Sequence, residues 1–249
     1  MSNKKTFYSK APFALKGEVI SHAPVVWDQF GPERGRKTRM HRWTSTKEEI
    51  LAWKGIHLGE TCCLIANGPS VNTLDLSKIN CPTFGLNMAW KLGDWTYYCL
   101  ADAQQVAEYQ KLRGPISELK PLFSTHAGPE SALRIRGLLS PVKKFSFDLT
   151  EGMYLNNTIT CSALQVAVWM GFKKIYIVGL DLSGDHFSSG TKQQKECKCR
   201  ETHFSNHRET FGYIAGLLTG MKSGIEIINL NPKSICFAFP KMKFEDVFH

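Results

Sequence analysis

A short apolar run that stops abruptly at a turn constrains the fold of this chain more than any other feature. Residues 61–66 (Thr-Cys-Cys-Leu-Ile-Ala) are rich in strand formers, and the turn Asn67-Gly68-Pro69-Ser70 follows at once. Glycine lets a ligand approach the backbone, proline suits the first turn of a helix, and serine can cap it. Free N–H groups at a helix start attract anions. The pattern predicts a buried strand followed by a phosphate-binding turn; an ordinary strand-to-helix turn is the alternative.

Alternating strand and helix patterns from residue 61 onward predict the fold class. This order is typical of βαβ units. We therefore expect an α/β fold with a Rossmann-like, doubly wound, mainly parallel sheet that binds ligands at the carboxyl ends of its strands. The predicted strands cover residues 61–66, 83–86, 96–101, 120–124, 144–147, 174–178 and 225–230, and the predicted helices cover residues 104–112, 129–138, 160–170 and 205–221.

Basic residues gather in the first part of the chain. The formal net charge is +9, and residues 1–43 hold nine Lys or Arg against three acidic residues. Glycine and proline interrupt this stretch, which favours an extended basic arm. Such an arm could contact anionic lipid head groups, an anionic acceptor or nucleic acid, or it could be a solvated segment that aids solubility or packs on a partner subunit.

The arm and the sheet suggest a division of the chain. Ser45-Thr-Lys-Glu48 has the capping-box spacing and predicts a short helix after the arm. We expect residues 1–58 to form the basic arm and this helix. Residues 59–249 would form a nucleotide-binding α/β transferase domain with a lid at about residues 183–204.

The apolar segments predict a cytoplasmic protein. No run of 18 apolar residues exists, and the N-terminus lacks the apolar core of a secretory signal. Most cysteines lie in apolar segments, where they are typical of reduced core residues. Through the basic arm, the protein could also associate peripherally with the inner membrane.

The second half of the chain contains another predicted helix N-terminus that could bind an anion. Thr160-Cys161-Ser162 opens an apolar predicted helix, and Asp181 ends the apolar strand that comes next. Ligand-binding side chains occupy such positions in open α/β sheets. The alternative for Asp181 is a cap on the following turn.

Six motifs in a fixed order resemble a known family. Over about residues 61–237, their order and spacing are similar to those of the bacterial sialyltransferases of glycosyltransferase family 42. They also resemble the wider nucleotide-binding group of motility-associated glycosylation proteins and hydroxymethylpterin diphosphokinase-like proteins. The motifs are Asn67-Gly-Pro-Ser70, Gly85-Leu-Asn87, Ile159-Thr160-Cys-Ser, the segment from Gly171 to Asp181, His203-Phe-Ser-Asn-His207 and Asn231-Pro232-Lys-Ser234.

The resemblance implies a nucleotide-activated sugar donor, with a CMP-sugar favoured, and a role for each matching residue. His207, the second histidine of the His-x-x-x-His motif, corresponds to the general base. The implied acceptor is a glycan of the lipopolysaccharide type, and related transferases often assemble as homo-oligomers. The expected nucleotide- or donor-binding residues are Asn67, Gly68, Pro69, Ser70, Asn87, Asp102, Thr160, Cys161, Ser162, Asp181, Ser183, Asn231, Pro232 and Ser234.

The chemistry of glycosyl transfer fits these residue types. Histidine has a pKa near 6.5, which suits a base that deprotonates an acceptor hydroxyl. Helix starts and hydroxyls can stabilise a departing phosphate without metal, and the Asp-x-Asp pattern of metal-dependent enzymes is missing. We therefore expect a metal-independent inverting glycosyltransferase. Thr158 and Ser183 stand where the sialyltransferases carry Arg and Tyr, so the donor sugar, sialic-acid-like or another, stays open.

A second constellation overlaps the predicted base. Cys197, Cys199, His203 and His207 form a C-x-C-x3-H-x3-H pattern, and zinc prefers such Cys and His sets. Zinc on all four would occupy His207, whereas zinc on Cys197, Cys199 and His203 or His186 would order the lid and leave His207 free. The alternative is two incidental cysteines beside the histidine motif, with no metal.

Two other functions remain open. One is an ATP-dependent, diphosphokinase-like transferase on the same core, with Asp102, Asp181 and Asp185 as the available carboxylates for Mg²⁺. The other is a zinc-containing nucleic-acid-binding module, which would bind with steep salt dependence. No base-reading motif supports the latter, so nucleic acid is the least expected partner.

Overall fold

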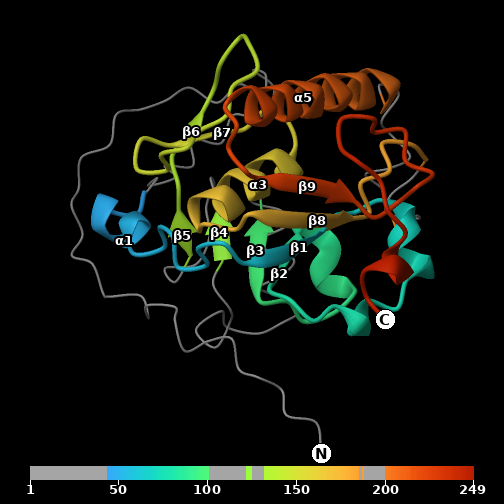
Figure 1. Cartoon of the computed structure of the whole chain (residues 1–249). Helices are drawn as coiled ribbons and strands as arrows, with labels where there is room; N and C mark the ends of the chain where they lie inside the picture. Colours follow the sequence, from blue (N-terminus) through green and yellow to red (C-terminus); the bar gives the residue numbers. More distant parts are fainter. Residues whose placement is uncertain (1–43, 101–121, 125–131, 185–186, 188–199) are drawn as a thin grey trace, which may run out of the picture.

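The computed structural model describes residues 44–100, 122–124, 132–184, 187 and 200–249 of the 249-residue chain (Figure 1). The basic arm, Asp102, the predicted helix at residues 104–112, His186, Cys197 and Cys199 lie outside these residues. No helix of the described part of the chain is long and apolar enough to cross a membrane.

A seven-stranded parallel sheet forms the centre of the molecule, as the alternating pattern predicted (Figure 1). Its strand order is β5-β4-β3-β2-β1-β8-β9, and every described strand pair is parallel. A separate two-stranded sheet pairs β6 with β7. The strands are β1 (Thr61–Ile65), β2 (Thr83–Leu86), β3 (Tyr97–Leu100), β4 (Leu122–Ser124), β5 (Leu133–Arg134), β6 (Gly137–Leu138), β7 (Met153–Tyr154), β8 (Lys174–Val178) and β9 (Glu226–Asn229).

Two apolar layers cover the two faces of the sheet. Successive β1 side chains enter opposite layers: Cys62 and Leu64 on one face, Cys63 and Ile65 on the other. Helices cover the first face, and short 3₁₀ turns with the C-terminal segment cover the second. The helices are α1 (Lys47–Leu51), α3 (Ile159–Trp169) and α5 (Arg200–Gly220), and the 3₁₀ turns are η2 (Pro69–Thr73), η3 (Leu76–Lys78), η4 (Asn87–Lys91) and η6 (Phe244–Asp246).

The short helix α1 forms one residue later than the capping box at Ser45 predicted. Thr46 is the N-cap, and its hydroxyl accepts a hydrogen bond from the Glu49 N–H at 3.2 Å. The Glu49 carboxylate accepts from the Thr46 N–H at 2.7 Å, which completes the box. Ser45 instead pairs with Arg134 of β5, because its N–H donates to the Arg134 carbonyl and its hydroxyl accepts from the Arg134 N–H. The sheet edge thus sets where the helix begins.

The predicted helix at residues 129–138 is wrong for its described part. Residues 133–134 and 137–138 form β5 and β6 instead. Pairing with β4 overrides the helical pattern, since β5 extends the parallel ladder and the Ile135 N–H donates to the Ser124 carbonyl at 2.9 Å.

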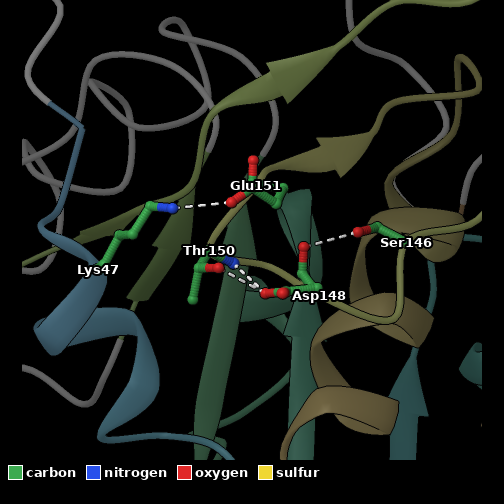
Figure 2. A network of polar contacts seen from close by, with 5 residues as sticks. All are labelled: Lys47, Ser146, Asp148, Thr150 and Glu151. Carbon is green, nitrogen blue, oxygen red and sulfur yellow. Dashed lines mark hydrogen bonds and ion pairs between the residues drawn. The ribbon is translucent and has the colours of Figure 1, made fainter.

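The predicted strand at residues 144–147 is also wrong, because side chains rather than a neighbouring strand satisfy its backbone. The Ser146 N–H donates to the buried Gln165 amide oxygen at 2.9 Å, and the Lys144 carbonyl accepts from Asn156. In Figure 2 the Ser146 hydroxyl donates to the Asp148 carbonyl, and the Asp148 carboxylate accepts from Thr150. The segment is therefore an ordered loop.

Both long helices form where they were predicted, and only α5 differs in length. α3 spans nearly the predicted residues, whereas α5 begins at Arg200, five residues before the predicted start. The last part of the expected lid is therefore helical. Both helices lie on the same side of the sheet (Figure 1).

Candidate functional site

The candidate site lies where the strand order reverses. From β1 the chain adds strands β2 to β5 on one side, and β8 and β9 then fill the other side. The connections after β1 and β8 therefore diverge at the carboxyl edge of these neighbouring strands, and open α/β sheets bind ligands in such crevices. The turn Asn67–Ser70 follows β1, and Asp181 follows β8.

The carboxylate of Asp181 collects three hydrogen bonds in this crevice. Oδ2 accepts from the Ser70 N–H at 2.8 Å, and Oδ1 accepts from the Ser70 hydroxyl at 2.6 Å. Oδ1 also accepts from the Asn231 side-chain amide at 2.7 Å. Asp181 is buried, with 4% of its surface exposed. The structure thus joins three of the predicted residues, and the donors of Ser70 point at a carboxylate of the protein itself.

The segment after β9 closes around the same aspartate. The Ser234 hydroxyl donates to the Leu180 carbonyl at 2.5 Å, and the Asp181 carbonyl accepts from the Ile235 N–H at 3.1 Å. Buried Asn229, which the motifs did not single out, donates from its amide to the Leu180 carbonyl at 3.0 Å. The position of Asn229 at the end of an apolar strand is the sequence signal that could have identified it. Pro232 is exposed on the turn between these residues.

Asn67 contributes an unusual buried acceptor to the site. Its side-chain oxygen Oδ1 is buried and has no hydrogen-bond partner among the described residues. Its backbone carbonyl accepts from the Phe187 N–H at 2.9 Å, so the turn itself is held in place. A buried acceptor without a partner is costly, which makes it a natural contact for a ligand N–H or O–H.

Other predicted residues lie at the same edge of the sheet. Asn87 follows β2 and has a φ of 44°, a left-handed backbone that asparagine tolerates better than most residues. Pro69 begins η2, and Ser183 is exposed after the end of β8.

His207 lies on α5 and contacts the turn before α3. Its Nε2 is 2.9 Å from the Asn157 carbonyl oxygen. A carbonyl only accepts, so Nε2 carries the hydrogen in the neutral ring and Nδ1 keeps its lone pair. Burial lowers the pKa of His207 below the usual 6.5; the bond to Asn157 opposes this shift, while the charges of His203 and Lys143 reinforce it. The imidazole is therefore neutral at pH 7 and can accept a proton at Nδ1.

The contact at Asn157 was missed in the sequence. Asn156 and Asn157 have φ values of 45° and 58°, and two successive asparagines are a turn signal. This turn brings its carbonyl to His207 and borders a hollow lined by residues 138–143 and the two asparagines. Lys143, in the wall of this hollow, also contacts the side chain of Asn206 on α5.

The start of α3 points inward. Thr160 and Ser162 are buried, and Cys161 is fully buried. Burial raises the pKa of the Cys161 thiol to about 12, and its sulfur accepts from the amides of Asn156 and Gln165. The thiol is therefore enclosed by protein and protonated at neutral pH, and Ser162 lines a small cavity with Leu100 and Ser124.

The zinc hypothesis falls mainly on residues that are not described. Within the described ranges, His203 and His207 have ring centroids 6.4 Å apart, and no group of three metal-ligating side chains is found there. Zinc at Cys197 and Cys199 therefore stays a prediction.

Comparisons with known proteins add a structural likeness. No protein-family model and no curated protein sequence matches the chain. Solved structures of the sialyltransferase CstII from Campylobacter jejuni are similar to it. The complex with cytidine-5'-monophosphate is 17% identical with a TM-score of 0.46, and the alignment covers 74% of this chain and 85% of that one. The complex with the analogue CMP-3FNeuAc is 16% identical with a TM-score of 0.44, covering 74% and 86%.

A third structure, of CST-II with a trisaccharide acceptor and CMP, is 18% identical with a TM-score of 0.43, covering 73% of this chain and 85% of that one. The chain thus resembles bacterial sialyltransferases, as its motif order predicted. The Rossmann-like fold itself is established by the parallel sheet described above.

Proposed function

We propose that this protein is a metal-independent, inverting glycosyltransferase that transfers a sugar from a nucleotide-activated donor to a hydroxyl of a glycan-type acceptor. The observation that carries the proposal is His207, whose ring is kept neutral by burial and fixed by one nitrogen on the Asn157 carbonyl. A histidine held in this way is suited to general base catalysis.

The proposed reaction is a single displacement. Nδ1 of His207 takes the proton of the acceptor hydroxyl while that oxygen attacks the anomeric carbon. The bond from this carbon to the phosphate oxygen breaks, and the nucleotide leaves with the electron pair. The first turn of α3 begins two residues after Asn157, and the positive end of this helix would stabilise the negative charge that develops on the phosphate.

The nucleotide would occupy the crevice after β1 and β8. The unpaired Oδ1 of Asn67 is free to accept a hydrogen bond there, which a hydroxyl or amino group of a nucleotide would supply. The motif resemblance selects CMP as the first nucleotide to test. The acceptor would approach from the hollow beside Asn157, next to the proposed base. A lipopolysaccharide-type acceptor, membrane contact through the basic arm and a homo-oligomer are further parts of this proposal.

Ligand-induced stabilisation tests the nucleotide. The unfolding temperature is measured with CMP, UDP, GDP and ATP, each with Mg²⁺ and with EDTA. We expect a shift that is selective for CMP and unchanged by EDTA; a ligand at 100 times its Kd adds about 2.7 kcal/mol to the unfolding free energy. A shift with ATP that requires Mg²⁺ would instead support the diphosphokinase-like transferase.

His207→Gln tests the base, with His203→Gln as the matched control one helical turn away. Glutamine can still donate to the Asn157 carbonyl but cannot take a proton at neutral pH. We expect hydrolysis of a CMP-sugar or transfer from it to fall about 10²- to 10⁴-fold in the first variant and little in the second. Equal activity of the His207 variant and the wild type would refute its role.

The pH profile provides a second readout for His207. Protonation of His207 removes the base, and burial lowers the pKa of His207 below 6.5. As the pH is lowered, kcat/KM should therefore stay constant past pH 6.5 and fall only at more acidic pH. The same shift makes protonation oppose folding: stability is complete above pH 6.5 and declines as the pH falls toward the lower pKa of the folded state. An acidic limb centred above pH 6.5 would contradict this environment.

A further inference from the structure

The bonds at Asp181 join three separate segments of the chain. The carboxylate belongs to the segment after β8, Ser70 to the turn after β1, and Asn231 to the loop after β9. A carboxylate has about four acceptor positions, and three of those of Asp181 are used within the protein. Hydrogen bonds to a charged acceptor are short and strong, so this contact is well suited to fix a loop.

The turn fits closely against this carboxylate. A Cβ on Gly68 would lie 2.5 Å from Asp181 Oδ2 and 2.5 Å from the Gly179 carbonyl oxygen. The Gly68 N–H donates to that same carbonyl at 2.8 Å. Immediately after Asp181, Leu182 has a left-handed φ of 53°, which is unfavourable for leucine and requires support from its surroundings. The geometry of the crevice is thus built around Asp181.

We propose that Asp181 is a positioning residue, which draws the Asn67–Ser70 turn and the Asn231 loop together and so shapes the nucleotide crevice before any ligand binds. The role differs from the ligand contact that the motifs implied, because the donors of Ser70 are directed at Asp181 instead of at a phosphate. The inference rests on the proposed function only for its nucleotide readout.

The direction in which CMP affinity changes when the Asp181 carboxylate is removed distinguishes a positioning role from a purely electrostatic one. A carboxylate near an anionic nucleotide repels it, so removal of the charge alone would tighten CMP binding. Removal of a positioning contact weakens binding, because the turn must be ordered when the ligand arrives.

The test exchanges the hydrogen-bond acceptor at position 181 and the donor at position 231. In Asp181→Asn the new amide has one acceptor oxygen, and in either orientation its NH2 group faces a donor, the Ser70 N–H or the Asn231 amide. Asn231→Asp restores the match, since the amide at position 181 can then donate to the carboxylate at 231 and still accept from the Ser70 N–H. Asp246→Asn, an exposed change of the same charge, is the control.

Two readouts are needed. Hydrogen exchange of the Ser70 amide, measured by NMR without ligand, reports the turn directly, and titration with CMP reports the crevice. We expect Asp181→Asn to accelerate exchange and to weaken CMP binding at least about tenfold, the equivalent of one charged hydrogen bond. The double variant should recover most of the slow Ser70 amide exchange and most of the CMP affinity of the wild type. Asp246→Asn should change neither the exchange rate nor the affinity.

Ser70→Ala provides a milder variant if Asp181→Asn unfolds. It removes only the hydroxyl bond to Asp181, and Ser77→Ala is its control because Ser77 makes an equal 2.6 Å bond to exposed Asp75. We expect Ser70→Ala to bind CMP several-fold more weakly than the wild type, and Ser77→Ala to bind it normally. Unchanged Ser70 exchange in Asp181→Asn, tighter CMP binding, or a double variant without recovery would each overturn the inference. If the wild type does not bind CMP, the proposed nucleotide fails, and amide exchange still decides the role of Asp181.

Discussion

Gly68 occupies a position where no side chain fits. A Cβ there would approach the Asp181 carboxylate and the Gly179 carbonyl to 2.5 Å each, which is far inside normal contact distance. Neither neighbour can move cheaply, since one is backbone and the other holds three hydrogen bonds. We therefore expect Gly68→Ala to lower the unfolding free energy by about 1–3 kcal/mol and to abolish CMP binding, as measured by denaturant unfolding and titration.

The matched control is Gly216→Ala on α5. Nothing lies within 4 Å of the Cβ position of Gly216, and alanine is the better helix former. This variant should gain up to about 1 kcal/mol and bind CMP normally. Equal stability of the two alanine variants would show that the turn after β1 can open without cost.

The sequence indicated where Asp181 and Ser70 lie in the fold, but it did not indicate their hydrogen-bond partners. Asp181 and Ser70 both follow apolar strands, and this position sufficed to place them at one edge of the sheet. A free donor on a turn looks the same whether it will meet a phosphate or a carboxylate of the protein. That choice depends on the approach of β1 and β8, which are more than 100 residues apart in sequence.

At the scale of elements, continuous apolar runs were predicted correctly and short mixed segments were not. β1 and β8 lie in the middle of the sheet, and after their first residues, Thr61 and Lys174, their sequences are apolar. Segments 132–138 and 144–147 are ordered by contacts with β4 and with Gln165, and neither contact has a local signature. The start of α1 shows the same effect, since two overlapping boxes fit the sequence and pairing with β5 selects one.

Thr46→Ala tests the selected cap. It removes the hydroxyl that accepts from Glu49, and α1 is coupled to the core through buried Ile50. We expect a loss of about 1 kcal/mol in the unfolding free energy, measured with urea. Lys47→Ala is the control within the same helix, because its ion pair with Glu151 is exposed and should contribute nothing measurable (Figure 2). A larger loss in the control would assign the stability of α1 to that ion pair instead.

At the scale of the whole molecule, the two faces of the sheet are covered in different ways. Helices α3 and α5 pack on one face. The other face receives 3₁₀ turns and the last residues of the chain, and Phe244 and Phe248 are both buried there. The ring of Phe248 meets Tyr176 of β8 edge to face, with centroids 5.7 Å apart. The C-terminal segment is therefore a structural part of the sheet's second layer and packs against β8, the strand that precedes Asp181.

Phe248→Ala tests this role of the C-terminal segment against a matched phenylalanine. Phe248 is 2% exposed, so its truncation removes a buried ring and should cost about 3–5 kcal/mol of unfolding free energy. Phe237 is 80% exposed and contacts only the Lys241 cation at 4.3 Å among the described ring contacts, so Phe237→Ala should cost at most about 1 kcal/mol. Equilibrium unfolding of both variants decides the matter. If Phe248→Ala is as stable as Phe237→Ala, the second face is held by the 3₁₀ turns alone.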